Sequence, residues 1–309
     1  MTEKIFNTIL TVVIGFLACC AVYFFFTEDK TKPATSAPST SESTTPPPTN
    51  TDHQPPQDKE QENDKQDENQ EKEQNNEKDQ QNDETAKPSD NLPEIVWGID
   101  SASETTTDFY ACVKENFGDP VVFGRYLGER EGISVGLSAE QVEIIHAEGD
   151  YILPIYNHFN DATGYDNGVK HATEAIKMAS DLGIPEDVAI FADIEPNYPV
   201  DAKFISGWFG TIVDSPYQSG IYGVFDPEQA LFAAFQEAGQ NNSAILEQNY
   251  IWTAAPNEGI TAESKAPKFN PSAPEGSLAW GWQYGLDAET CNIDTNLFKR
   301  ELIDVLWGT

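Results

Sequence analysis

The sequence predicts an α/β fold, a (β/α)8 TIM-like barrel over residues 94–309 that is preceded by a transmembrane helix and a disordered linker. Eight short β-rich runs alternate with helical or loop segments through the last 216 residues. Regular alternation of strands and helices is typical of a parallel sheet, and eight units in this length are typical of a closed barrel. Residues 5–26 carry no charge, and residues 27–93 contain almost no large apolar residues.

Residues 5–26 form an uncharged, mostly apolar segment of 22 residues that ends in three phenylalanines. At 1.5 Å per residue this segment is long enough to cross a hydrocarbon core of roughly 30 Å. We therefore expect a membrane anchor over residues 1–26, with the transmembrane helix at 5–26. A cleaved signal peptide is the main alternative, but its apolar core is usually ~7–15 residues and ends in small residues. The Leu-Ala-Cys-Cys stretch at 17–20 resembles a bacterial lipobox, which leaves lipidation as a third possibility.

Residues 27–93 have no Trp, Tyr, Phe, Ile, Val or Met and only one Leu. Pro, Ser and Thr dominate their first part, and Gln, Asn, Glu, Asp and Lys dominate their second part. Such a segment cannot build a core, so we expect a disordered linker that averages ~45 Å end to end. With the short N-terminus expected in the cytoplasm, this layout predicts a single-pass protein of the cell membrane. Its C-terminal domain would be extracellular, within or beyond a bacterial cell wall.

The charge of the chain excludes one large class of function. It holds 52 Asp and Glu against 18 Lys and Arg, a formal net charge of −34. Nucleic-acid binding and adhesion to anionic lipid both need clustered basic residues, so neither is expected. Residues 94–309 alone hold 34 acidic and 10 basic residues, so most of the negative charge, −24, belongs to the barrel domain.

The strands are expected where β-branched and aromatic residues cluster between turn residues. The eight runs are 96–100, 121–127, 151–156, 188–194, 220–225, 250–254, 278–284 and 292–294.

Helix signals lie between several of these runs. Residues 138–147 begin with Ser138 and carry Glu140 in the first turn, and residues 168–182 place apolar side chains at helical spacing before Gly183. Asp226 and a following proline predict a helix over 227–238. Helical patterns are weak between the last three strands, which predicts an irregular last third of the barrel.

Carboxyl side chains occur at the predicted C-terminal ends of the strands. Asp100 ends the first strand, and Asp193 and Glu195 end the fourth, where the period of two places both on one face. Asp294 lies in the last run, next to the first strand in a closed barrel. Reactive side chains of such barrels lie at this edge, so we expect the four acids to converge and at least one pKa to rise. A glycosidase requires this combination of a protonated carboxyl and ionised ones.

The motifs GIDSAS, PIYNHF, FADIEPN, GIYG, YIWTAAP, WGWQYG and NIDTNLF, in this order, resemble the barrel of the glycoside hydrolase family 25 lysozymes. They resemble still more closely the relatives of these lysozymes called glycoside-hydrolase-like domains, domain of unknown function 1906. The resemblance covers nearly all of residues 97–298. It implies that Asp100, Asp193, Glu195 and Asp294 are the catalytic residues, with Glu195 as the general acid. Asp193 would stabilise the developing positive charge or orient the N-acetyl group of the substrate as an internal nucleophile.

Aromatic and amide side chains near the strand ends are candidates for sugar binding, because aromatic faces stack on sugars and amides bind hydroxyl groups. Ordinary packing is the alternative for each aromatic, and a structural ion pair is the alternative for the arginine. The arginine stands where the lysozymes carry a lysine, and the third strand also departs from their small-residue context. The candidates are Arg125, Tyr156, His158, Tyr222, Trp252, Trp282, Gln283 and Tyr284.

Cys112 and Cys291 are the two cysteines of residues 94–309. Cys112 follows the first strand and Cys291 precedes the last run, so a closed barrel brings their regions together. An exported protein permits oxidation. We therefore predict a disulfide between them, and two buried thiols are the alternative.

Two functions fit these features. The first is a membrane-tethered, extracellular glycoside hydrolase that acts on peptidoglycan or a related N-acetyl-sugar polymer, in the manner of a lysozyme or muramidase. The second is a hydrolytically inactive carbohydrate- or cell-wall-binding module on the same barrel, because hydrolysis is not established for all of the similar glycoside-hydrolase-like domains. A divalent cation held by the clustered carboxylates is a third, weaker interpretation, and we expect no metal and no cofactor.

Overall fold

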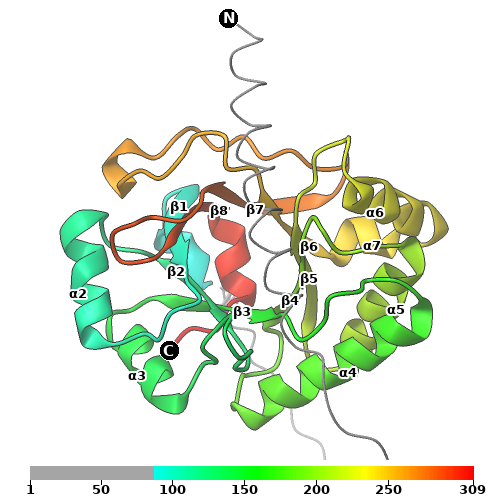
Figure 1. Ribbon diagram of the computed structural model, residues 1–309, viewed down its shortest axis with the longest axis horizontal. Helices are drawn as coiled ribbons and strands as arrows, with labels where there is room; N and C mark the ends of the chain where they lie inside the picture. The colour runs from blue at the N-terminus through cyan, green and yellow to red at the C-terminus, as the bar shows by residue number, and fades with distance from the viewer. Residues whose placement is uncertain (1–86) are drawn as a thin grey trace, which may run out of the picture. The chain divides into compact units, whose positions relative to one another are not determined.

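The computed structural model describes residues 87–309, which form a closed eight-stranded barrel flanked by helices (Figure 1). The strands follow one another around the barrel in chain order. They are β1 Ile95–Asp100, β2 Val122–Tyr126, β3 Tyr151–Tyr156, β4 Ala189–Ile194, β5 Gln218–Gly223, β6 Tyr250–Ala254, β7 Leu278–Gly285 and β8 Asp294–Lys299. The predicted closed α/β barrel is thus confirmed.

The predicted transmembrane helix at 5–26 and most of the predicted linker lie outside the described residues. Residues 88–91, which the sequence assigns to the linker, form a short 3-10 helix, η1 (Pro88–Asn91). The backbone N–H of Ser89 donates to Asp304 Oδ1 at 3.2 Å, so the ordered fold begins before residue 94. Within residues 87–309, no helix has both the length and the apolar character needed to span a membrane.

The eighth strand corrects the expectation of a uniformly parallel barrel. Strands β1 to β7 pair in parallel, whereas β8 is antiparallel to both β7 and β1. The predicted strand at 292–294 is wrong, because Asn292 lies in a turn and the strand begins at Asp294. The connection from β7 to β8 spans residues 286–293 only, and a parallel crossover needs a dozen or more residues. The chain therefore reverses direction.

Six α-helices and two further 3-10 helices complete the described part of the chain. The predicted helix at 138–147 is confirmed, with Ser138 accepting a hydrogen bond from the Gln141 N–H, and the predicted helix at 168–182 begins slightly earlier. The helix predicted at 227–238 begins only at residue 230, because Asp226 caps a separate turn before it. The elements are α2 Thr107–Asn116, α3 Ala139–Ala147, α4 Tyr165–Asp181, α5 Ala202–Val213, α6 Ala230–Asn241, α7 Ala244–Gln248, η2 Glu263–Lys265 and η3 Arg300–Val305.

Alternation along each strand divides the core into two layers. Side chains such as Val96, Leu153 and Phe191 point into the barrel, whereas their neighbours in sequence pack outward beneath the helices. After β8, the 3-10 helix η3 adds Leu302 and Ile303 to the interior layer. Since β8 runs antiparallel, η3 lies at the edge where β1 to β7 begin, and that edge is filled with apolar side chains. The opposite edge, where β1 to β7 end, is left to carry polar groups.

Candidate active site

Four acidic side chains line one cavity at the edge where the parallel strands end. Asp100 is the last residue of β1, Asp193 lies near the end of β4, and Glu195 follows β4 directly. Asp294 is the first residue of β8, and the antiparallel direction of this strand brings its beginning to the same edge. The cavity has a volume of about 210 Å³, and all four carboxyls contribute to its wall.

The cavity exists because the side chains that point into the barrel near this edge differ in size. Gly124 of β2 is paired with Asp100, and a methyl group at this glycine would lie 2.7 Å from the Asp100 Cβ. A larger residue there would therefore displace the carboxyl. The next inward residue of β2 is Tyr126, which lines the cavity together with Ile155, Tyr222 and Trp252 from the following strands.

Two amide side chains hold Asp100 and Asp294. The Gln283 Nε2 donates to Asp100 Oδ2 at 3.0 Å and to Asp294 Oδ2 at 3.2 Å, so one amide bridges two carboxyls. The Asn296 Nδ2 donates to the same Asp100 oxygen at 2.7 Å. The amides are themselves oriented, because Tyr222 Oη donates to Gln283 Oε1 at 2.7 Å and the Trp252 indole donates to Asn296 Oδ1 at 2.8 Å.

Burial sets the proton affinity of this first pair of acids. Burial raises the pKa of Asp100 to about 6, although hydrogen bonds from Asn296 and Gln283 oppose the rise. Burial, together with the nearby Asp100 charge, raises the pKa of Asp294 to about 8, against the hydrogen bond from the Asp287 N–H. Asp100 therefore remains mostly ionised at neutral pH, and Asp294 takes up a proton more readily.

The second pair, Asp193 and Glu195, has a different environment. Burial, followed by the Glu195 charge, raises the pKa of Asp193 well above its usual range, and among residues 87–309 its Oδ1 has no hydrogen-bond partner. Burial also raises the pKa of Glu195, while the positive charge of Arg130 lowers it. Two carboxyls with raised pKa values, two residues apart, favour a shared proton at neutral pH, because their mutual repulsion opposes ionisation of both.

Three of the predicted sugar-facing residues line the acid cavity: Tyr222, Trp252 and Gln283. All three occupy inward positions of neighbouring strands, β5, β6 and β7. The Tyr222 and Trp252 rings lie with centroids 4.4 Å apart and form one aromatic wall beside the acids.

The other five candidates do not line the acid cavity, and strand alternation explains four of them. Arg125 is fully buried on the outer face of β2, where its guanidinium binds the Ser101 and Val135 carbonyl oxygens and Gln141 Oε1. Tyr156 also points outward, and its hydroxyl lies 2.9 Å from His171 Nδ1. Both predictions of a substrate contact for these residues are corrected by the structure.

Trp282 and Tyr284 flank Gln283 and therefore face the outer layer. The Trp282 indole donates to the Ala255 carbonyl oxygen at 3.1 Å, and the Tyr284 hydroxyl accepts a hydrogen bond from the Trp97 indole at 3.0 Å. His158 lies beyond the end of β3, and its Nδ1 is 3.6 Å from Glu174 Oε1. It borders a separate surface cavity rather than the cavity of the acids.

Sequence reasoning missed Tyr126, Asn296 and Asp287. The period of two that groups Asp193 with Glu195 also contains the signal for two of them. Tyr126 lies two residues after Gly124, and Asn296 lies two residues after Asp294. Asp287 has no such signal, because its N–H reaches Asp294 only through the conformation of the turn between β7 and β8.

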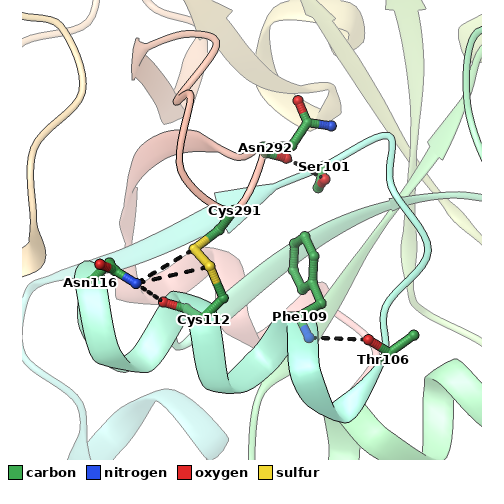
Figure 2. The surroundings of a disulfide bond; sticks show 7 residues. All are labelled: Ser101, Thr106, Phe109, Cys112, Asn116, Cys291 and Asn292. Atoms are coloured by element: carbon green, nitrogen blue, oxygen red, sulfur yellow. Dashed lines mark hydrogen bonds between the residues drawn. A yellow bond between two sulfur atoms is a disulfide. The ribbon is translucent and has the colours of Figure 1, made fainter.

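A disulfide joins Cys112 of α2 to Cys291 in the turn before β8, as Figure 2 shows. The residue after Cys291 is held as well, since Ser101 Oγ donates to the Asn292 carbonyl oxygen at 2.7 Å. Ser101 in turn directly follows Asp100. The turn that leads into Asp294 is thus fastened both to the helix after β1 and to the end of β1.

The described residues provide no preformed metal site. Within 87–309, no group of three or more His, Cys, Asp or Glu side chains has the arrangement needed to hold a metal ion. The four acids face one cavity, but Gln283 and Asn296 already donate hydrogen bonds to Asp100 Oδ2.

A closed α/β barrel with carboxyls and aromatic side chains around one mouth is compatible with a glycoside-hydrolase-like barrel. The model of the Rv2525c-like, glycoside hydrolase-like domain family matches residues 120–274, and the chain belongs to this family.

The chain is also similar to several solved structures. An uncharacterized protein of B. stearothermophilus is 42% identical, with a TM-score of 0.67, and the match covers 69% of this chain and 100% of that one. The Tat-secreted protein Rv2525c of Mycobacterium tuberculosis is 15% identical over 69% of this chain and 99% of that one, with a TM-score of 0.46. The modular autolysin LytC of Streptococcus pneumoniae is 14% identical over 66% and 46% of the two chains, with a TM-score of 0.44. No curated protein matches the chain.

Proposed function

We propose that this protein hydrolyses glycosidic bonds of peptidoglycan or a related N-acetyl-sugar polymer. The observation that carries the proposal is the cavity in which four carboxyls face an aromatic wall, with two of them, Asp193 and Glu195, in an environment that favours one shared proton. Glycoside hydrolysis requires one carboxyl that donates a proton and another that stabilises positive charge. Membership of a glycoside-hydrolase-like family supports the same reaction class.

Glu195 is the general acid in this proposal. It is the more exposed member of the pair, beyond the end of β4, and so it is better placed to reach a substrate oxygen than Asp193, which is 5% exposed. As the bond between the anomeric carbon and the leaving oxygen breaks, Glu195 transfers its proton to that oxygen. Water then adds to the anomeric carbon and gives up a proton to a carboxylate.

Asp100 would act through its charge, and Asp294, whose pKa burial raises to about 8, would be mostly protonated at neutral pH and would act as a hydrogen-bonding group. Asp100 is held by two amide donors and is mostly ionised at neutral pH, so it can stabilise an oxocarbenium-like centre. Asp193 would stabilise the same centre once its proton has moved, or orient the N-acetyl group of the substrate. Tyr222 and Trp252 offer the aromatic face on which the sugar packs.

We also propose that the protein works outside the cell, tethered by residues 5–26 and extended by the linker. The charge-free length of residues 5–26 and the apolar-poor linker support this location. The disulfide between Cys112 and Cys291 supports an oxidising compartment. Cell fractionation tests the tether: the full chain should sediment with membranes and be cleaved by protease added outside, and a chain lacking residues 1–26 should not sediment.

The test of the activity is release of reducing ends from purified peptidoglycan by the full chain, compared with Glu195→Gln. We expect release by the wild type and a loss of at least about 100-fold in the variant. Glu228→Gln, the same change at an exposed position in the loop before α6, serves as the matched control and should retain full activity. Equal binding of the polymer by both proteins without release by either would contradict hydrolysis and favour the binding module.

A further inference from the structure

A second cavity, of about 390 Å³, lies beside the acid cavity on the loops that follow β2 and β3. Its polar and aromatic wall is formed by Glu129, Arg130, Glu131, His158, Phe159 and Asn160. None of these residues lines the acid cavity. The two cavities are related through Arg130, whose positive charge lowers the pKa of both Asp193 and Glu195 and which is therefore close to them.

Within the described part of the chain, the Arg130 guanidinium is held by neutral groups only. Its NH1 group donates to the Asn157 carbonyl oxygen at 2.9 Å and to the Tyr198 hydroxyl at 3.2 Å. Tyr198 belongs to the turn after β4, and its backbone N–H donates to the Glu195 carbonyl oxygen at 2.9 Å. Among residues 87–309, no carboxylate lies within 4 Å of the Arg130 nitrogens.

The loop that carries Arg130 is itself built into the barrel. The Arg130 N–H donates to the Ser134 carbonyl oxygen at 2.9 Å, and the Ser134 N–H donates back to the Arg130 carbonyl oxygen at 3.0 Å. Ser134 Oγ accepts a hydrogen bond from the Nδ2 of buried Asn157 at the end of β3. The side chain and the backbone of Arg130 are thus both tied to β3. The guanidinium is presented in a fixed place, with donors left over.

An arginine without an ion-pair partner among residues 87–309 is unusual in a domain that carries a net charge of −24. Glu129 and Glu131 flank Arg130 in the sequence, but both are exposed and their charges are screened by solvent. A planar guanidinium with free N–H groups matches the two oxygens of a carboxylate. Because the rest of the domain repels anions, an anionic ligand would need such a specific partner.

We infer that Arg130 binds a carboxylate substituent of the sugar polymer and so selects carboxylated amino sugars over neutral ones. This inference rests on the proposed function, since it adds a subsite to the same mouth of the barrel. A sugar in the acid cavity would place its neighbour or its substituent over the loop after β3. There the carboxylate would lie between the Arg130 fork and the His158 ring, and Phe159 would provide an apolar contact.

The test compares two probes, the disaccharide N-acetylglucosaminyl-N-acetylmuramic acid and its methyl ester, in which a methyl group replaces the negative charge of the carboxylate. Their affinities are measured by NMR titration of the full chain in detergent micelles. We expect the wild type to bind the acid about tenfold more tightly than the ester, as one charge-assisted hydrogen-bonded contact provides. In Arg130→Gln the ratio of the two affinities should fall to about one. In Arg130→Lys, which keeps the charge but not the fork, it should be intermediate.

Because each ratio is measured within one variant, a general loss of affinity does not obscure it, and circular dichroism confirms that each variant is folded. Arg300→Gln removes an arginine from the opposite edge of the barrel and should keep the tenfold ratio. A ratio near one in the wild type, an unchanged ratio in Arg130→Gln, or no binding of either probe to the wild type would overturn the inference. Release of reducing ends from peptidoglycan is a separate measurement, so failure of this subsite and failure of the proposed hydrolysis can be told apart.

Discussion

Replacing Asp100 by asparagine should make the protein more stable at neutral pH and less active. The Asp100 side chain is 5% exposed, and burial raises its pKa from 3.8 to about 6. The folded protein therefore binds this proton more tightly than the unfolded chain does. As the pH rises from about 4 to 6, ionisation costs the folded state more than the unfolded state, and the penalty stays constant above pH 6.

The size of the penalty follows from the two pKa values. At 1.36 kcal/mol per pH unit, the difference between 3.8 and about 6 corresponds to about 3 kcal/mol above pH 6. Asparagine should preserve the local contacts, because its carbonyl oxygen can accept the hydrogen bonds that Gln283 and Asn296 donate to Asp100 Oδ2. It also removes a negative charge that raises the pKa of Asp193 and Asp294, which adds to the gain.

The assay is urea unfolding and thermal unfolding of both proteins between pH 3.5 and 8. The variant should equal the wild type near pH 3.5 and exceed it by about 3 kcal/mol at pH 8, which corresponds to a rise in Tm of about 6–12 °C for a domain of this size. Its hydrolytic activity should fall about 100-fold. Asp226→Asn, the same change at an exposed position before α6, is the matched control and should not reproduce the gain of about 3 kcal/mol at pH 8. A gain that is independent of pH, or a variant less stable than the wild type at pH 8, would refute the reasoning.

Three further predictions concern Gln283, the disulfide and the ionisation of Asp100. Gln283→Met removes three hydrogen bonds around a side chain that is 1% exposed. The free energy of unfolding, measured in urea, should therefore fall by about 2–4 kcal/mol. An unchanged free energy would contradict the proposed hydrogen-bond network. The double change Cys112→Ser and Cys291→Ser removes a disulfide between positions 179 apart in the sequence. The free energy of unfolding, measured without reductant, should fall by up to about 5 kcal/mol. A fall below about 1 kcal/mol would show that the disulfide contributes little to stability. The rate at which reducing ends are released should decline below about pH 6, because Asp100 takes up a proton there. A rate that stays constant from pH 5 to 7 would show that catalysis does not require an ionised Asp100.

The sequence predicts the strands well because strand signals are local. The run at 151–156 coincides with β3 and the run at 250–254 coincides with β6, since each is a compact β-rich segment between turns. The direction of β8 was not predicted, although the short spacing between β7 and β8 contains the information. A pattern of eight units suggests eight equal repeats, whereas the length of a connection decides whether the next strand can be parallel.

Some features of the candidate site can be predicted from the sequence, and others cannot. The convergence of Asp100, Asp193 and Glu195 could be predicted, because strand ends meet at one edge of a barrel whatever the details of packing. The residue types of Trp282 and Tyr284 suit sugar binding, but strand alternation places both side chains in the outer layer. Asp294 reaches the site for a reason that differs from the predicted one, since it begins an antiparallel strand rather than lying within a parallel one.

Amide hydrogen-bond donors give Asp100 a different environment from that of Asp193. Asp100 receives two amide hydrogen bonds, which favour its ionised form and limit the rise of its pKa. Asp193 receives none from an amide, and its pKa rises further under the same degree of burial. Environments that push the pKa values of neighbouring carboxyls apart are what distinguish an acid from a charge stabiliser in one site. Gln283 and Asn296 favour the ionised form of Asp100 and leave the proton to the pair of Asp193 and Glu195, in which Glu195 is the proposed general acid. The amides therefore determine the chemistry of the site as much as the acids do.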